Sequence, residues 1–128
     1  RQEAHAGKAL AAELGDAPVT VLGVPDRLEA ALANLLDNAL AFAASTVAVH
    51  ITSVNGDVRI TVADDGPGIA PEDREHVFER FFTRRSGQGG TGLGLALVRA
   101  IVEAHGGRVW VEASASGGAA FIVSLPRA

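Results

Sequence analysis

The chain contains no cysteine among its 128 residues, which excludes disulfide frameworks, thiolate metal sites and cysteine nucleophiles. It has no run of roughly 18 consecutive apolar residues, the length typical of a membrane-spanning helix, and no signal peptide is visible. The 15 acidic residues outnumber the 11 basic ones, and the net charge of -4 argues against a nucleic-acid partner. A cysteine-free core also suits the cytoplasm.

Apolar residues make up 48% of the sequence, which is enough for one buried core. There is no internal repeat and no long linker, so we expect a single domain over residues 1–128. The polar opening segment, residues 1–7, is expected to be the tail of an upstream helix.

Hydrophobic periodicity predicts two long helices. The first, over about 26–43, follows a proline, shows capping-box spacing between Asp26 and Glu29, and repeats leucine and alanine on one face. The second, over about 92–104, ends at a pair of glycines. A shorter helix is expected over 73–82.

Alternating apolar residues predict the strands of a sheet. Residues 46–54 and 58–62 flank Asn55-Gly56, a dipeptide that favours a type I′ hairpin turn because both residues tolerate positive φ. Long helices on one face of a mixed, mostly antiparallel sheet form an α/β two-layer sandwich. The other predicted strands are 9–14, 19–23, 109–113 and 120–125.

Two asparagines, Asn34 and Asn38, share a stripe of the first helix on the side away from its leucines. Asparagine is a poor helix former, and a solvated position would ordinarily carry Glu, Lys or Arg. A solvated face remains the alternative for either residue alone. The pair favours a magnesium site, because amide oxygens are hard neutral ligands and Mg²⁺ takes its other ligands from phosphates and water.

A turn of sequence Asp-Gly-Pro-Gly, residues 65–68, follows the strand over 58–62. One interpretation is a tight turn with no further role. The other is that the glycines let a flat ligand approach the backbone. Asp65 would then accept a hydrogen bond from an exocyclic amine, in a pocket with apolar walls such as Ile69.

A second glycine-rich stretch, residues 89–95, leads into the helix over 92–104. Glycines before a helix N-terminus leave backbone N–H groups available to a phosphate, and the helix dipole favours negative charge. Gly87, Gly89 and Gly92 have G-x-G-x-x-G spacing, but no strand precedes them as a dinucleotide-binding fold requires. A P-loop is excluded because the only lysine of the chain is Lys8.

Taken in order, these features resemble the catalytic ATP-binding domain of sensor histidine kinases. That domain has the Bergerat (GHKL) fold, shared with DNA gyrase and the mismatch-repair protein MutL. The similarity covers about residue 8 to the end. The asparagine helix resembles the family's N box, and the other motifs are a first glycine box at 65–68, a phenylalanine box at 78–82, a second glycine box at 90–95 and a last glycine motif at 117–121.

The resemblance implies a role for each motif. Asn38 would coordinate Mg²⁺ bridging the ATP phosphates, with Asn34 beside it, and Asp65 would bind the adenine amino group. Residues 80–91 would form the ATP lid. Further nucleotide contacts are implied for Gly66, Gly68, Ile69, Arg80, Arg84, Gly90, Thr91, Gly92, Leu93 and Gly94.

The implied activity is transfer of the γ-phosphoryl group of ATP to a histidine on an N-terminal dimerisation segment, for relay to a response-regulator aspartate. None of the four histidines (His5, His50, His76 and His105) lies in the family's acceptor motif, so the acceptor is expected before residue 1. The parent would be a membrane-anchored sensor with this domain in the cytoplasm. Hydrolysis should be poor, because Asn34 stands where ATPases of the superfamily carry a water-activating glutamate.

Two alternatives remain open. One is an anti-sigma-type serine kinase of the same fold, which the phenylalanine box and long lid before Thr91 disfavour. The other is a non-catalytic nucleotide-binding or interaction module. Three departures from the family pattern would allow it: Ala41 in place of a basic residue, Thr83 in place of an arginine, and Ala119 with its neighbour in place of a threonine.

Overall fold

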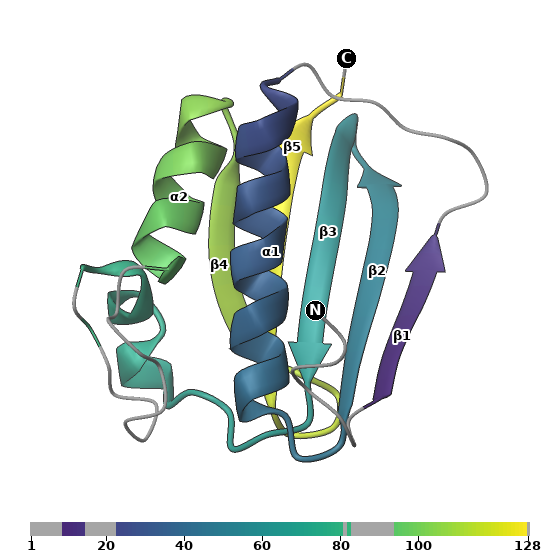
Figure 1. Cartoon of the computed structure of the whole chain (residues 1–128), viewed down its shortest axis with the longest axis vertical. Coiled ribbons are helices and arrows are strands. Elements are labelled where there is room, and N and C mark those ends of the chain that lie inside the picture. Colours follow the sequence, from purple (N-terminus) through teal and green to yellow (C-terminus); the bar gives the residue numbers. More distant parts are fainter. Residues whose placement is uncertain (1–8, 15–22, 81, 83–93, 128) are drawn as a thin grey trace.

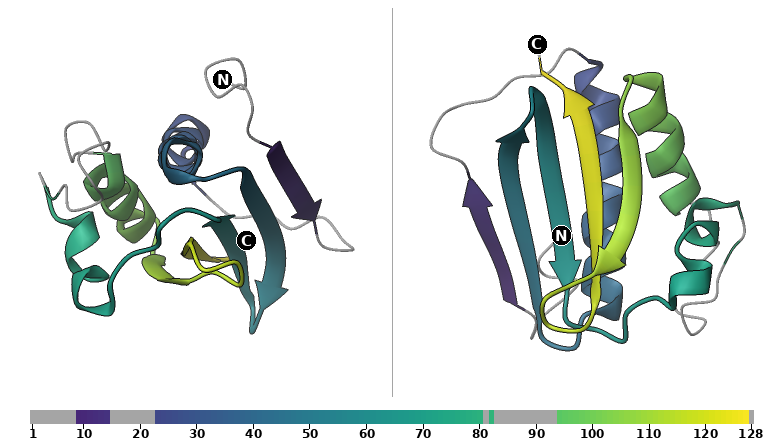
Figure 2. Two further views of the ribbon diagram at one scale, coloured as in Figure 1. Left: turned by 90° about the horizontal axis from the view of Figure 1, so that it is seen from below. Right: turned by 180° about the vertical axis from the view of Figure 1, so that it is seen from behind.

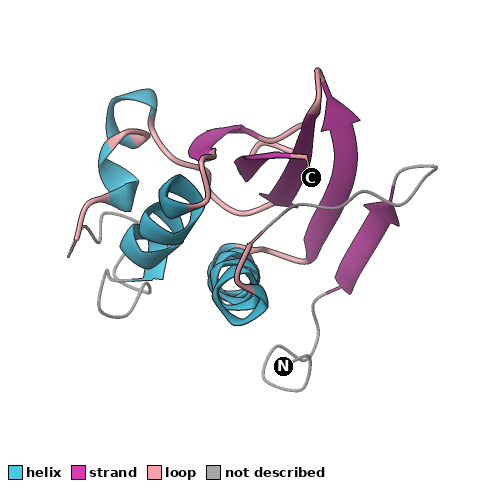
Figure 3. Ribbon diagram, turned by 90° about the horizontal axis from the view of Figure 1, so that it is seen from above, coloured by secondary structure: helices cyan, strands magenta, loops and turns pink. Residues whose placement is uncertain are grey.

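The structure, a computed structural model, describes residues 9–14 as backbone and residues 23–80, 82 and 94–127 in full. The described part forms a sheet with two α-helices on one of its faces (Figures 1 and 3). The elements are β1 (Ala9–Leu14), α1 (Pro25–Phe42), β2 (Thr46–Val54), β3 (Asp57–Asp64), η2 (Pro71–Asp73), η3 (His76–Phe78), α2 (Gly94–Ala104), β4 (Arg108–Ala113) and β5 (Ala119–Pro126).

The five strands lie in the order β1-β2-β3-β5-β4. β1 runs parallel to β2, and every other neighbouring pair is antiparallel. The predicted mixed, mostly antiparallel sheet is therefore confirmed. No described helix or strand covers the face opposite to α1 and α2 (Figure 2).

The hairpin of β2 and β3 forms as the sequence predicts. Asn55 and Gly56 have φ of 52° and 86°, the positive values that a two-residue type I′ turn needs. The tight turn fixes the register, in which Val54 pairs with Asp57. As a result Val58, Ile60 and Val62 all point into the core, where each is at most 7% exposed.

The start of α1 differs from the prediction. The helix begins at Pro25 with Val24 as its N-cap, and no side chain caps it. The capping box predicted for Asp26 and Glu29 is therefore wrong. Proline is pre-organised for the first helical position, so the helix starts one residue earlier and Asp26 falls inside its first turn.

Two other boundaries also differ. The helix predicted over 73–82 is instead a pair of single 3₁₀ turns, η2 and η3. The strand predicted over 19–23 reaches the described part only at Gly23, which is a bend. The end of α2 is as predicted: Gly106 has φ of 79°, and the N–H of Gly107 bonds to the carbonyl of Val102, as in a Schellman motif.

The core lies between the two helices and the sheet. Its largest fully buried side chains come from both layers: Phe121, Leu35, Val47, Val62, Val98 and Val102. Phe78 of η3 packs edge-on against Phe121, with ring centroids 6.0 Å apart. Phe78 thereby fixes the start of the phenylalanine-box segment to the core. Within the described ranges, no helix has the length and apolar character that a bilayer crossing requires.

Candidate nucleotide-binding site

The candidate site lies where β3 ends and α1 passes over the sheet. Asn34 is half-buried on α1, and its side-chain N–H donates to the carbonyl of Ala30 at 2.9 Å. This bond turns the amide oxygen toward the N-terminus of α2, where a Cβ added to Gly94 would lie 3.1 Å from it. Asn38, one turn further along α1, is also half-buried. Both asparagines thus lie outside the leucine-lined core, as predicted.

Asp65 closes the loop between α1 and β2. One carboxylate oxygen accepts the backbone N–H groups of Ala44, Ser45 and Thr46 at 2.8, 3.0 and 3.1 Å. The other accepts the hydroxyl of Ser45 at 2.8 Å. Hydrogen bonds from the Ser45 and Thr46 backbone hold the pKa of Asp65 well below its ordinary value. Both oxygens therefore serve the loop, a role that the sequence prediction for Asp65 missed.

Asp64 is the buried carboxylate of this region. It is 1% exposed, and its Oδ1 accepts the N–H of Gly66 at 2.9 Å and the N–H of Ala119 at 3.2 Å. Its backbone carbonyl accepts the hydroxyl of Ser114 at 2.8 Å. A carboxylate is rarely buried unless its charge is met by hydrogen bonds or used for recognition. Asp64 is therefore a functional candidate.

The signal for Asp64 was present in the sequence. Side chains alternate along a strand, and Val58, Ile60 and Val62 of β3 all face the core. The same alternation places Asp64 inward and turns the next residue away. The sequence prediction chose Asp65, directly before the glycine, and did not continue the alternation of β3 from Val62 to Asp64.

Two glycines, Gly66 and Gly118, allow close packing of the backbone around Asp64. A Cβ on Gly66 would overlap the carbonyl oxygen of Phe42, and one on Gly118 would overlap the backbone and carboxylate of Asp64. Gly68 has φ of 78°, which favours glycine. The predicted close approach at Gly66 is thus, within the protein, an approach to the end of α1.

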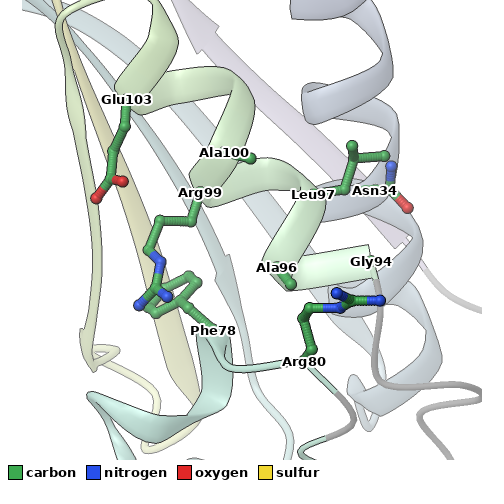
Figure 4. A pocket seen from close by; sticks show the side chains of 9 residues that line it. All are labelled: Asn34, Phe78, Arg80, Gly94, Ala96, Leu97, Arg99, Ala100 and Glu103. Atoms are coloured by element: carbon green, nitrogen blue, oxygen red, sulfur yellow. The ribbon is translucent and has the colours of Figure 1, made fainter.

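A cavity of about 690 Å³ opens beside these elements (Figure 4). It brings together three residues predicted for the site, Asn34, Arg80 and Gly94. Leu97 on its wall is 47% exposed and, with Val24, is one of two exposed large hydrophobic side chains in the described part of the chain. The lining residues are Asn34, Phe78, Arg80, Gly94, Ala96, Leu97, Arg99, Ala100 and Glu103.

The other predicted positions divide in two groups. Ile69 is half-buried and packs against the core, and Ala41, Ala119 and Ala120 are half-buried or buried. The positions that lie outside the described residues are Thr83, Arg84, Gly90, Thr91, Gly92 and Leu93. Segment 1–7 also lies outside them.

The side chains that could hold a metal ion here are amides. The described ranges hold no group of three or more His, Cys, Asp or Glu side chains that could bind a metal. An amide oxygen such as that of Asn38 fits an ion that takes most of its ligands from phosphates and water.

Comparison with known proteins gives consistent relatives. The family described as histidine kinase-, DNA gyrase B-, and HSP90-like ATPase matches residues 23–128. The sensor histidine kinase CpxA of Escherichia coli (strain K12) is 40% identical over 124 residues, covering 94% of this chain and 27% of CpxA. RstB of the same organism is 47% identical over 103 residues, covering 77% of this chain and 24% of RstB. The chain thus spans about a quarter of the length of these curated relatives.

Solved structures give the same result. The mycobacterial sensor histidine kinase MprB has a TM-score of 0.88 at 32% identity, over 98% of this chain and 86% of that one. Full-length ShkA in complex with AMPPNP has a TM-score of 0.84 at 36% identity, over 95% and 26%. The predicted Bergerat-type sandwich is confirmed by these neighbours. The chain belongs to the histidine kinase-, DNA gyrase B- and HSP90-like ATPase family, and within it to the catalytic ATP-binding domains of sensor histidine kinases.

Proposed function

We propose that this domain binds Mg-ATP and donates the γ-phosphoryl group to a histidine on a dimerisation segment N-terminal to it. Its relatives include the sensor histidine kinases CpxA and MprB, and ShkA was solved in complex with AMPPNP. The observation that carries the proposal is the buried carboxylate of Asp64, held by backbone N–H groups beside the helix of Asn34 and Asn38.

For the adenine base we propose Asp64 in place of Asp65. Two backbone N–H groups orient the carboxylate of Asp64, and a carboxylate has acceptor sites for about four hydrogen bonds. A carboxylate held in this orientation is a suitable acceptor for the exocyclic amine of adenine. Asp65 already accepts four hydrogen bonds from the loop over 44–46, so an adenine contact there would compete with the contacts that close the loop.

For the phosphates we propose three contributions. The amide oxygen of Asn38 would be the protein ligand to Mg²⁺. The N-terminus of α2 at Gly94 carries the positive end of the helix dipole. Arg80, on the cavity wall, adds a positive charge (Figure 4). Mg²⁺ itself would supply charge neutralisation between the phosphates, and the remaining work is positioning.

The same geometry disfavours hydrolysis. Asn34 stands beside the N-terminus of α2, with its N–H bonded to the carbonyl of Ala30. An amide cannot take a proton from water as a carboxylate base does. The phosphoryl group would therefore wait for an acceptor supplied by another segment.

We propose that the cavity of Figure 4 receives the helix carrying the acceptor histidine. The cavity shares Asn34 and Gly94 with the proposed nucleotide site. Its wall offers the exposed side chain of Leu97 with Arg99 and Glu103 around it, a pattern of apolar centre and charged rim that is typical of protein interfaces. We further propose that the phosphoryl group passes on to a response regulator and that the parent protein is anchored in a membrane. The sensor-kinase relatives are the support for both proposals.

The test is calorimetric titration of ATP, with and without Mg²⁺, into the chain and three variants. We expect Asp64→Asn to abolish measurable binding, Asn38→Ala to remove the dependence on Mg²⁺, and Asp65→Asn to retain binding. Retained binding in Asp64→Asn with loss in Asp65→Asn would overturn the adenine assignment. Absence of binding in the parent chain would favour the non-catalytic interaction module, and phosphorylation of a serine on a supplied partner would favour the serine kinase.

A further inference from the structure

A second cavity, of about 120 Å³, lies in the core between α1 and the sheet. It shares no lining residue with the cavity at the nucleotide site. It lies toward the opposite end of β3, since Ile60 on its wall precedes Asp64 by four residues. The lining side chains are all aliphatic: Leu28, Ala31, Leu32, Leu35, Ile60, Val102, Val123 and Leu125.

The cavity lies at Ala31, a small residue between the leucines on the buried face of α1. Ala31 is 3% exposed and faces the core on the same helical stripe as Leu28 and Leu35. The two leucines set the distance between the helix and the sheet, and the methyl group of Ala31 is too short to fill the space between them. The opposing Val102 and Val123 are also compact.

We propose that this cavity binds a small apolar molecule of about the size of benzene. A buried water needs two to four polar partners, and every described lining side chain is aliphatic, within helices and strands whose backbone groups pair with one another. An apolar cavity of about 150 Å³ engineered into another protein stays dry and binds benzene or xenon. A hydrocarbon here would gain dispersion contacts with these aliphatic side chains without displacing a hydrogen-bonded water.

The position gives the ligand a mechanical role. It would fill the space beneath the first three turns of α1, the helix that carries Asn34 and Asn38 on another face. It would therefore support that helix from the core side without touching the nucleotide site, and its binding is independent of whether the domain binds ATP.

The test is methyl NMR of the chain titrated with benzene and, separately, with phenol. We expect benzene to shift the methyl signals of Leu35, Val102 and Val123 in a saturable manner. Phenol should bind at least about tenfold more weakly, because its hydroxyl finds no partner among aliphatic side chains. At about ten times its dissociation constant, benzene should also raise Tm by about 4 °C.

Three variants make the test specific. Ala31→Val and, from a different helix, Val102→Ile fill the cavity and should abolish both the shifts and the rise in Tm. Ala33→Val places the same substitution on the side of α1 away from the cavity and should leave both unchanged. Absence of saturable shifts in the parent chain, or equal shifts in the parent and both filled variants, would overturn the proposal.

Discussion

The imidazole of His105 joins the start of one helix to the end of the other. Its Nε2 accepts the backbone N–H of Val24 at 3.0 Å, and its Nδ1 pairs with the carbonyl of Ile101 at 2.8 Å. The ring thus holds the N-cap residue of α1 from a position directly after the last residue of α2. These contacts give His105 a structural role.

Replacing this ring should loosen the contact between the two helices. We expect His105→Ala to lower the free energy of unfolding by about 1–3 kcal/mol, since both hydrogen bonds of the ring and its packing are lost. Urea denaturation followed by circular dichroism measures the change. Glu103→Ala, which truncates an exposed side chain near the end of α2, is the control and should change the value by no more than about 0.5 kcal/mol. Equal losses in the two variants would contradict the interpretation.

Acid stability should depend on Asp65. Its pKa is held below the ordinary value of 3.8 in the folded chain, so its contribution is fully present above that value and is lost as the pH falls below it. We expect Asp65→Asn to flatten the loss of stability below about pH 4, measured by urea denaturation at a series of pH values. Ser45→Ala removes only the hydroxyl donor and should have a smaller effect. If the free energy of unfolding of Asp65→Asn fell with pH below about 4 as steeply as that of the parent chain, the role of Asp65 in acid stability would be wrong.

His76 should titrate above the ordinary histidine value. Its Nδ1 lies 2.9 Å from a carboxylate oxygen of Glu79, and this partner raises the pKa of His76 above 6.5. The resulting stabilisation is present below pH 6.5 and is lost as the pH rises through the raised pKa. Imidazole signals in an NMR titration give the midpoint directly. Glu79→Gln should return it toward 6.5, and the same midpoint in both proteins would show that the pair is not formed in solution.

Gly118 and its neighbour Gly117 should respond differently to alanine. At Gly118 a Cβ would overlap Asp64, so Gly118→Ala should cost about 1–3 kcal/mol of stability and weaken ATP binding by displacing that carboxylate. Gly117 has φ of 92° but nothing within 4 Å of an added Cβ. Gly117→Ala should therefore cost about 1–2 kcal/mol through backbone strain and leave ATP affinity unchanged. Denaturation and calorimetry on both variants separate the two effects, and equal ATP affinities would contradict them.

The fold was predictable where a local pattern determines it. Asn55-Gly56 fixes the register of the β2–β3 hairpin through its φ angles, and the leucine stripe fixes the buried face of α1. The hydrogen bond of the N-cap residue Val24 was not predictable, because its partner His105 lies 81 residues away in sequence. The segment over 73–82 carries helix-forming residues, but tertiary packing of Phe78 holds it as single turns.

The candidate site was predictable in its motifs and less so in its atoms. The sequence placed both asparagines on one stripe of α1, and the structure agrees on their position. It could not show that Asp65 accepts the N–H groups of the loop over 44–46, because that loop comes from another part of the chain. It therefore did not separate the role of Asp65 from that of the buried Asp64. The roles of residues 84–93 remain predictions.

Side chains along β3 alternate between the two faces of the sheet with a period of two residues. Val58, Ile60, Val62 and Asp64, at every second position after the turn at Asn55-Gly56, face the side that α1 covers. Inserting or deleting a single residue between Val58 and Asp64 would reverse the faces to which Asp64 and Asp65 point, while the sequence of the motif itself stays the same. Relatives of this domain should therefore tolerate substitutions along the strand far more readily than any odd change in its length.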